Sequence, residues 1–222
     1  TTMVDAGYGS MQYLKDQLPG SNMDFLSTRR WLDASDDKKG IQLGMKEAFM
    51  AAPDSMVDER LFFNENVKRW RDGGKPTSLW FSYVMNNYWH TNFKADQEGI
   101  SQFQYALKPH GAYDPVAQEK TAEEFTNPLF AFPVNEKVTL PGNLFTLSNE
   151  KIIVTSITPQ PDGNFLIRLF NPGAEAQSTI IRWESIRPKN IQISSSGKIM
   201  DTDSTLPIPG YDVVDYIVNM VQ

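Results

Sequence analysis

Glycine and proline interrupt this chain so often that long regular elements have little room. Fourteen of each occur among 222 residues, and the runs between them are short and rich in β-branched and aromatic residues. Such runs, bounded by Pro, Gly, Asn and Asp, are typical of β-sandwich strands. We therefore expect strands at Gly40–Glu47, Ser78–Asn86, Ser101–Leu107, Lys151–Pro159, Asn164–Phe170, Ser178–Trp183, Asn190–Ser194 and Val213–Met220.

Local signals add one hairpin and one or two short helices. The turn Pro161-Asp162-Gly163-Asn164 predicts a hairpin, because proline presets one turn dihedral and glycine accepts the positive one. Asp114-Pro115 opens a short surface helix over Val116–Phe125, with an N-cap residue followed by proline at the first helical position. A second, less regular helical pattern covers Met56–Arg71.

The pattern of the chain changes near Phe132–Pro141. Long polar and aromatic motifs precede this point, and short strands with tight turns follow it. We predict a mostly β protein: a large antiparallel β-sandwich portion (supersandwich-like) over residues 1–135 and a small C-terminal β-sandwich over residues 136–222.

Composition excludes several classes of function. Without cysteine there is no disulfide, thiolate metal site or nucleophilic thiol. The net charge of −6, with no block of Lys and Arg, argues against a nucleic-acid partner. No apolar run approaches the roughly 18 residues that span a bilayer, so no membrane partner is expected. The start, Thr1–Gly7, has no initiator Met and no signal-peptide pattern, so we expect a piece of a longer chain, compatible with bacterial cytoplasm or periplasm.

The run Ser82–Phe93 combines amides and aromatic rings in an arrangement that suits sugar recognition. Amides hydrogen-bond hydroxyl groups, and aromatic rings cover the apolar face of a pyranose. Alternatively, the rings fill the core while the amides brace neighbouring loops. The candidate substrate-rim or domain-contact residues are Asn86, Asn87, Trp89, His90, Thr91 and Asn92.

Other candidate residues are weaker. Asp96 and Glu98, two residues apart on a strand, would share a face as a glycosidase pair, although a solvated turn ending in Gly99 explains them equally. His90 and His110, the only histidines, have no acidic cluster between them and make a poor metal site. No nucleophile elbow, phosphate loop or dinucleotide fingerprint occurs. No catalytic residue and no metal ligand is therefore predicted in this chain.

The run Tyr83–Gly99, followed by Phe103–Leu107, resembles the C-terminal β region of bacterial glycoside hydrolase family 38, the α-mannosidases. Shorter matches occur in the same order and cover nearly the whole chain: Gln17–Ser21, Arg30–Ser35 with Gly40-Ile41, Asn127–Leu129 and Phe165–Pro172. Met56–Gly74 matches no family motif, which suggests a lineage-specific insertion.

The resemblance implies a non-catalytic portion of a retaining α-mannosidase, whose zinc and aspartate nucleophile lie in a separate α/β barrel. Its expected partners are that barrel, on the same polypeptide, and α-mannoside glycans. Asn86, Asn87, Trp89, His90, Thr91 and Asn92 would then lie nearest the catalytic domain. Two alternatives stay open: a stand-alone carbohydrate-binding module, which the 12% aromatic content favours, and a pure interaction sandwich. A piece separated from its barrel would also expose a surface for self-association.

Overall fold

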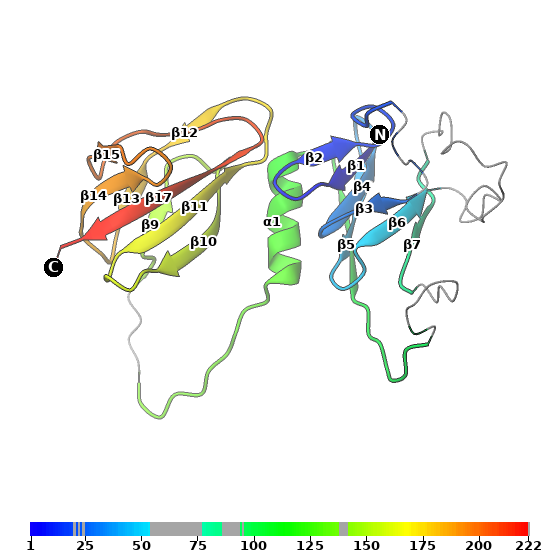
Figure 1. The fold of residues 1–222 in the computed structure, drawn as a ribbon, viewed down its shortest axis with the longest axis horizontal. Coiled ribbons are helices and arrows are strands. Elements are labelled where there is room, and N and C mark those ends of the chain that lie inside the picture. The colour runs from blue at the N-terminus through cyan, green and yellow to red at the C-terminus, as the bar shows by residue number, and fades with distance from the viewer. Residues whose placement is uncertain are drawn as a thin grey trace. The chain divides into compact units, whose positions relative to one another are not determined.

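The computed structural model describes residues 1–19, 21, 23, 25–53, 77–85, 94, 96–137 and 142–221 (Figure 1). The chain divides into two compact units. The first unit comprises Thr1–Asp114 and Thr121–Asn127, and the second comprises Pro115–Lys120 and Pro128–Gln222. The boundary that the sequence suggests between residues 135 and 136 stays a prediction.

The first unit contains a five-stranded and a three-stranded antiparallel sheet. The larger sheet has the order β2-β1-β4-β5-β8, and the smaller has the order β3-β6-β7. Their strands are β1 (Thr2–Asp5), β2 (Ser10–Gln12), β3 (Leu26–Ser27), β4 (Trp31–Ser35), β5 (Gly40–Met45), β6 (Met50–Pro53), β7 (Trp80–Ser82) and β8 (Tyr105–His110).

The two sheets of the first unit pack face to face. Leu32 of β4 and Met45 of β5 are buried with Ala51 of β6, and Trp80 of β7 packs against them. Leu32 lies opposite Leu43 in the larger sheet, and the next pair along the strands is Asp33 with Gln42. Because side chains alternate between the faces of a sheet, this register directs the leucines into the sandwich and the polar pair to the opposite face.

Helix α1 (Pro115–Thr126) begins directly after Asp114 and ends before Asn127-Pro128, as its N-cap and proline signals predict. It is more deeply buried than a surface helix. Ala122 is almost fully buried. On the first unit, the helix lies over the polar face of the larger sheet, since a Cβ added at Gly44 would meet the Phe125 ring at 3.0 Å.

The second unit is built on a five-stranded antiparallel sheet of order β10-β11-β17-β14-β15, with the two-stranded sheets β12-β16 and β13-β9. Its strands are β9 (Phe145–Leu147), β10 (Ile153–Pro159), β11 (Phe165–Asn171), β12 (Gln177–Thr179), β13 (Ile181–Trp183), β14 (Pro188–Ile193), β15 (Ile199–Met200), β16 (Leu206–Ile208) and β17 (Asp212–Met220).

The core of the second unit joins the five-stranded sheet to the smaller ones. Leu169 of β11 and Val218 of β17 are buried with Ile181 of β13 and Leu206 of β16. The predicted hairpin is present between β10 and β11, where Gly163 has a φ of 83°. In this turn the backbone N–H of Gln160 donates to the backbone carbonyl oxygen of Asn164 at 2.8 Å.

The predicted fold class is confirmed. Every strand pair in the described residues is antiparallel, and α1 is the one α-helix among them. The single strand predicted at Ser178–Trp183 is wrong: it is divided into β12 and β13, which belong to different sheets. The helical pattern at Met56–Arg71 lies outside the described residues.

Candidate functional site

A buried acid and a histidine meet on the helix-covered face of the larger sheet in the first unit. Asp33 in β4 is completely buried, and its Oδ2 contacts Nε2 of His110 at the end of β8. The other ring nitrogen, Nδ1, lies 2.9 Å from the carbonyl oxygen of Gly111. A carbonyl oxygen can only accept, so Nδ1 of His110 donates to Gly111 while Nε2 faces the carboxyl group of Asp33.

Glycine at position 40 makes room for this histidine. Gly40 in β5 lies directly opposite His110 in β8. A Cβ at residue 40 would come within 2.4 Å of the imidazole and 2.6 Å of the Ser35 side chain, so any larger residue would displace the ring. The absence of a side chain at Gly40 thus lets His110 reach the carboxylate of Asp33.

A second buried charged group, Arg30, ties α1 to the sheet. Its Nε donates to Oδ2 of Asp5 at 3.0 Å, and its Nη1 contacts a carboxylate oxygen of Glu123 in the helix. Burial raises the pKa of Asp5 above its ordinary value, although the Arg30 guanidinium opposes that effect. Asp5 also accepts a hydrogen bond from the backbone of Gly7 at 2.8 Å. These contacts have a structural role, since Arg30 and Asp5 are buried and join the sheet to the helix.

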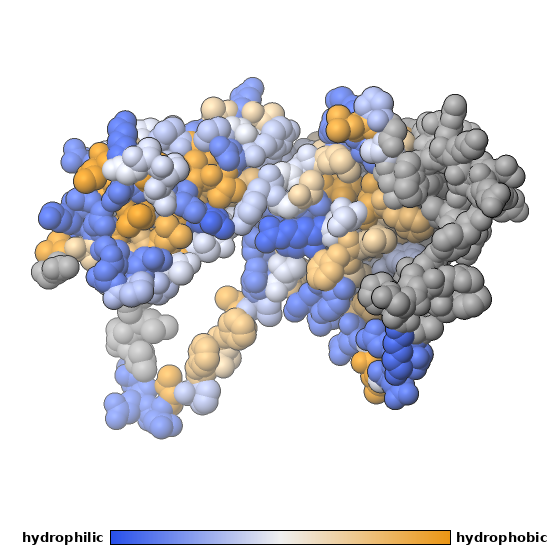
Figure 2. Space-filling model, in the orientation of Figure 1, coloured by the Kyte–Doolittle hydropathy of each residue, from blue (hydrophilic) through white to orange (hydrophobic). Residues whose placement is uncertain are grey.

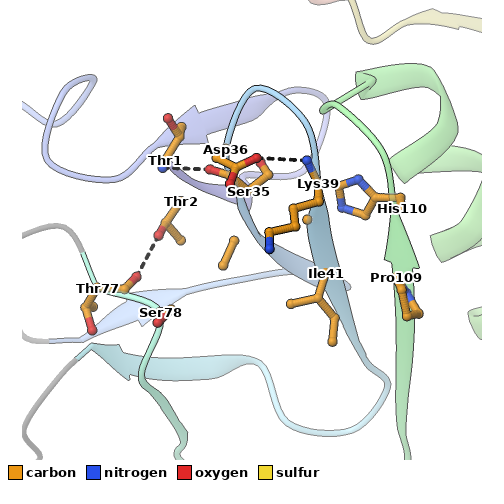
Figure 3. A pocket seen from close by; sticks show the side chains of 12 residues that line it. Thr1, Thr2, Ser35, Asp36, Lys39, Ile41, Thr77, Ser78, Pro109 and His110 are labelled. Carbon is orange, nitrogen blue, oxygen red and sulfur yellow. Dashed lines mark hydrogen bonds between the residues drawn. The ribbon is translucent and has the colours of Figure 1, made fainter.

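A pocket of about 700 Å³ opens on the first unit beside His110 (Figure 3). Its lining is mixed: Lys39 and Asp36 bring charges, while Ile41 and Pro109 bring apolar surface. The backbone N–H groups of residues 38 and 39 hold the pKa of Asp36 below its ordinary value.

The pocket offers little aromatic surface on which a sugar ring could stack. Among its described lining residues, the imidazole of His110 is the only ring with π-electrons. The flat aromatic surface on which carbohydrate-binding modules seat a pyranose is therefore not found in this lining. The hydroxyl of Thr2, on another wall, is already used, since it donates to the carbonyl oxygen of Thr77 at 3.0 Å.

The predicted rim residues and the predicted acid pair differ in whether the structure describes them. Asn86, Asn87, Trp89, His90, Thr91 and Asn92 all lie outside the described residues. Asp96 and Glu98 are described, and both are exposed and belong to no strand. The ammonium of Lys94 lies 3.3 Å from Oδ2 of Asp96. This arrangement fits the solvated turn better than the glycosidase pair.

The structure does fix both ends of the segment that contains the run of amides and aromatic rings, Ser82–Phe93. Ser82, the last residue of β7, lies with its hydroxyl 2.8 Å from the hydroxyl of Tyr105, the first residue of β8. The amide of Tyr83 donates to the carbonyl of Met50 at 2.9 Å. At the other end, the carboxylate of Glu47 accepts hydrogen bonds from the backbone of Gln104 at 2.8 Å and from its side chain at 3.2 Å. The chain from 83 to 104 thus leaves and rejoins the sandwich at adjacent points.

Two absences complete the description of the site. Within the ranges that the structure describes, no three His, Cys, Asp or Glu side chains lie together as a metal site would require. No helix in that same part of the chain has the length and hydropathy of a membrane span.

Sequence reasoning missed the contact between Asp33 and His110. In the sequence Asp33 stands out only as part of the motif Arg30–Ser35, and His110 only as a candidate metal ligand. The usable signal was an acid within a short apolar run, Trp31-Leu32-Asp33-Ala34, because an acid buried in a strand needs a partner.

Together, these observations define a class of protein: an antiparallel β protein of two units. The buried polar contacts described above join its strands and helix to one another. Solved structures extend this description. The fold is similar to an α-mannosidase from Enterococcus faecalis V583, with a TM-score of 0.63 and 13% identity over 98% of this chain and 24% of that one. It is also similar to a protein in the glycosyl hydrolase family 38 from Enterococcus faecalis, with a TM-score of 0.63 and 14% identity over 98% of this chain and 25% of that one.

The chain thus spans about a quarter of the length of the solved structures that it matches. No protein-family model matches the sequence, and no curated protein matches it significantly. At this identity the structural similarity establishes the fold. The resemblance to glycoside hydrolase family 38 that the sequence motifs indicate is confirmed at that level.

Proposed function

We propose that this chain is the non-catalytic C-terminal portion of a zinc-dependent, retaining α-mannosidase. In this proposal it packs on the catalytic domain and shapes the rim of its active site. One observation carries the proposal: 98% of this chain superimposes on a quarter of a protein named as an α-mannosidase. The ordered sequence motifs from Gln17 to Pro172 support the same assignment independently.

The proposed role of the chain is positioning. The candidate rim residues Asn86, Asn87, Trp89, His90, Thr91 and Asn92 fall within the segment whose two ends the first unit holds together. A segment with fixed ends presents its side chains with a smaller loss of conformational entropy than a free one. Amide and indole groups suit contact with sugar hydroxyls and with the apolar face of a mannoside.

In this proposal the zinc is held by the catalytic region. The described residues hold no group of three potential ligands, so they do not fit a zinc site. No chemical step is therefore assigned to residues of this chain.

The test begins with the reading frame upstream of the codon for Thr1. We expect it to encode an α/β region, and the polypeptide that joins this region to the present chain should hydrolyse 4-nitrophenyl α-mannoside and lose that activity to a chelator. The 222-residue chain should show no hydrolysis. An unrelated upstream frame, or hydrolysis by the chain by itself, would overturn the proposal.

The rim assignment needs its own variants in the longer polypeptide. Asn87→Ala and His90→Ala should change kcat or KM while the melting temperature stays near that of the parent. Asn143→Ala, at an exposed position of the second unit outside both proposed contact segments, is the matched control and should change neither. Unchanged kinetics in both rim variants would remove these residues from the rim.

The alternative function is a stand-alone carbohydrate-binding module. It predicts that mannose changes the tryptophan fluorescence of the 222-residue chain. The described pocket does not favour it, since no aromatic side chain except His110 lines that pocket. A saturable fluorescence change together with an unrelated upstream frame would replace the first proposal with this one.

A further inference from the structure

The loop that follows α1 carries an apolar strip exposed to solvent. Four of the six residues from 129 to 134 are large, apolar and exposed. Their exposed fractions are 101% for Leu129, 81% for Phe130, 80% for Phe132 and 64% for Val134. The loop leaves the C-terminal end of α1 in Figure 1, and it is coloured as hydrophobic surface in Figure 2. These four side chains are called the apolar strip below.

Nothing in the described chain holds the apolar strip in place. Residues 129–137 belong to no helix or strand and make no hydrogen bond or ion pair with another described residue. The rings of Phe130 and Phe132 contact each other, with centroids 6.4 Å apart. No charged side chain occurs from Pro128 to Asn135, although 22% of the whole chain is charged. A charge-free row of exposed large apolar side chains is characteristic of a surface that is covered in the assembled protein.

We propose that the apolar strip docks into an apolar groove of the catalytic region of the same polypeptide. This inference rests on the proposed function and names the contact surface between the two parts. The solved structures that share this fold extend over about four times the length of this chain, so most of such a polypeptide is available to cover the strip. A second copy of the chain is a poorer occupant, because two chains that each carry a net charge of −6 repel each other.

The experiment is carbene photolabelling of the longer polypeptide that contains this chain, read by mass spectrometry at single residues. Ile199 and Tyr211 are internal references, since they are 64% and 50% exposed and lie far from residues 129–134 in the sequence. We expect labelling of Phe130 and Phe132 to be several-fold below that of both references at every protein concentration. Labelling of the strip equal to that of the references would overturn the docking.

A triple variant supplies the second measurement. Leu129→Ser/Phe130→Ser/Phe132→Ser in the longer polypeptide should lower its melting temperature, or separate the melting of its parts, whereas Ile199→Ser should not. Since the three side chains are exposed in the chain itself, the same substitutions should leave the melting of the 222-residue chain unchanged. Equal melting of the triple variant and the parent polypeptide would contradict the proposal.

The outcomes separate this inference from the proposed function. Mannoside hydrolysis with a fully labelled strip would refute the docking alone. A protected strip without hydrolysis would support the docking and refute the enzymatic assignment. Protection that appears only as concentration rises, together with a dimer in light scattering, would assign the strip to self-association and overturn the proposal.

Discussion

Replacing Asn171 should remove the side chain that joins two turns of the second unit. Asn171 is only 1% exposed and follows the last apolar residues of β11. Its amide nitrogen donates to the carbonyl oxygens of Glu175 at 2.8 Å, Pro209 at 3.0 Å and Ile208 at 3.3 Å. Its Oδ1 accepts the backbone N–H of Gly173 at 3.1 Å. One side chain thus connects the turn after β11 to the end of β16.

The cost of Asn171→Ala follows from these contacts. The two N–H groups of the amide are shared among three carbonyls and count as two hydrogen bonds, and the bond that Oδ1 accepts is the third. The substitution thus removes about three hydrogen bonds, each worth about 1 kcal/mol net. We expect a loss of about 3 kcal/mol in the unfolding free energy of the second unit. For a unit of about 100 residues, that loss lowers the melting temperature by roughly 12–24 °C. Asn171→Asp should cost more at neutral pH, because a carboxylate would then face the same carbonyl oxygens.

The assay must report the two units separately. Urea unfolding followed by pulsed hydrogen exchange and mass spectrometry does so, with peptides from β11 and β17 reporting the second unit. Asn135→Ala is the control, since its side chain is exposed, and it should stay within about 0.5 kcal/mol of the parent. A loss below about 1 kcal/mol for Asn171→Ala, or an Asp variant as stable as the parent at neutral pH, would refute the reasoning.

Three further predictions concern titratable groups. His110→Ala leaves the buried Asp33 side chain without its hydrogen-bond partner and should destabilise the first unit by about 2 kcal/mol in urea unfolding, whereas the double variant with Asp33→Asn should not show the sum of the two single losses. Arg168 hydrogen-bonds Asp215 and lowers the pKa of its carboxyl group, so the pair stabilises the folded state above the unfolded pKa of about 3.9, and this stability is lost as the pH falls. Arg168→Met should therefore make the loss of unfolding free energy at acid pH less steep. An unchanged pH dependence would refute this. Burial raises the pKa of Tyr216 to about 12, so this residue should make stability fall between about pH 10 and pH 12, and Tyr216→Phe should reduce that fall in alkaline unfolding curves.

The parts of the fold that sequence reasoning found depend on short-range signals. The hairpin at Gly163 and the start of α1 after Asp114 are each encoded by a few neighbouring residues. The long strands β11 and β17 carry dense apolar residues and were found for the same reason. The fold class follows from the sum of such signals, because a chain with many short strands and frequent turns has few architectures open to it.

The missed elements depend on partners far away in the sequence. Strands β1 and β4 contain the buried acids Asp5 and Asp33, which weaken the local apolar pattern. Asp5 is compensated by Arg30, 25 residues away, and Asp33 by His110, 77 residues away. No short window contains both members of either pair. The break between β12 and β13 is equally hidden, because both halves have strand-like composition and only the sheet that each joins distinguishes them.

The same reasoning explains why the candidate site was predicted as residue types and not as geometry. A run of amides and aromatic rings is visible in the sequence, but the contact of Ser82 with Tyr105 that closes its segment joins the ends of two different sheets. Those two sheets are held in place by the core around Leu32 and Trp80. In the proposed function the chain affects catalysis through this segment, because a rim residue acts only if its position is fixed. The stability of the first unit and the proposed rim function are therefore coupled: substitutions in its core should affect turnover through the segment without any contact with the substrate.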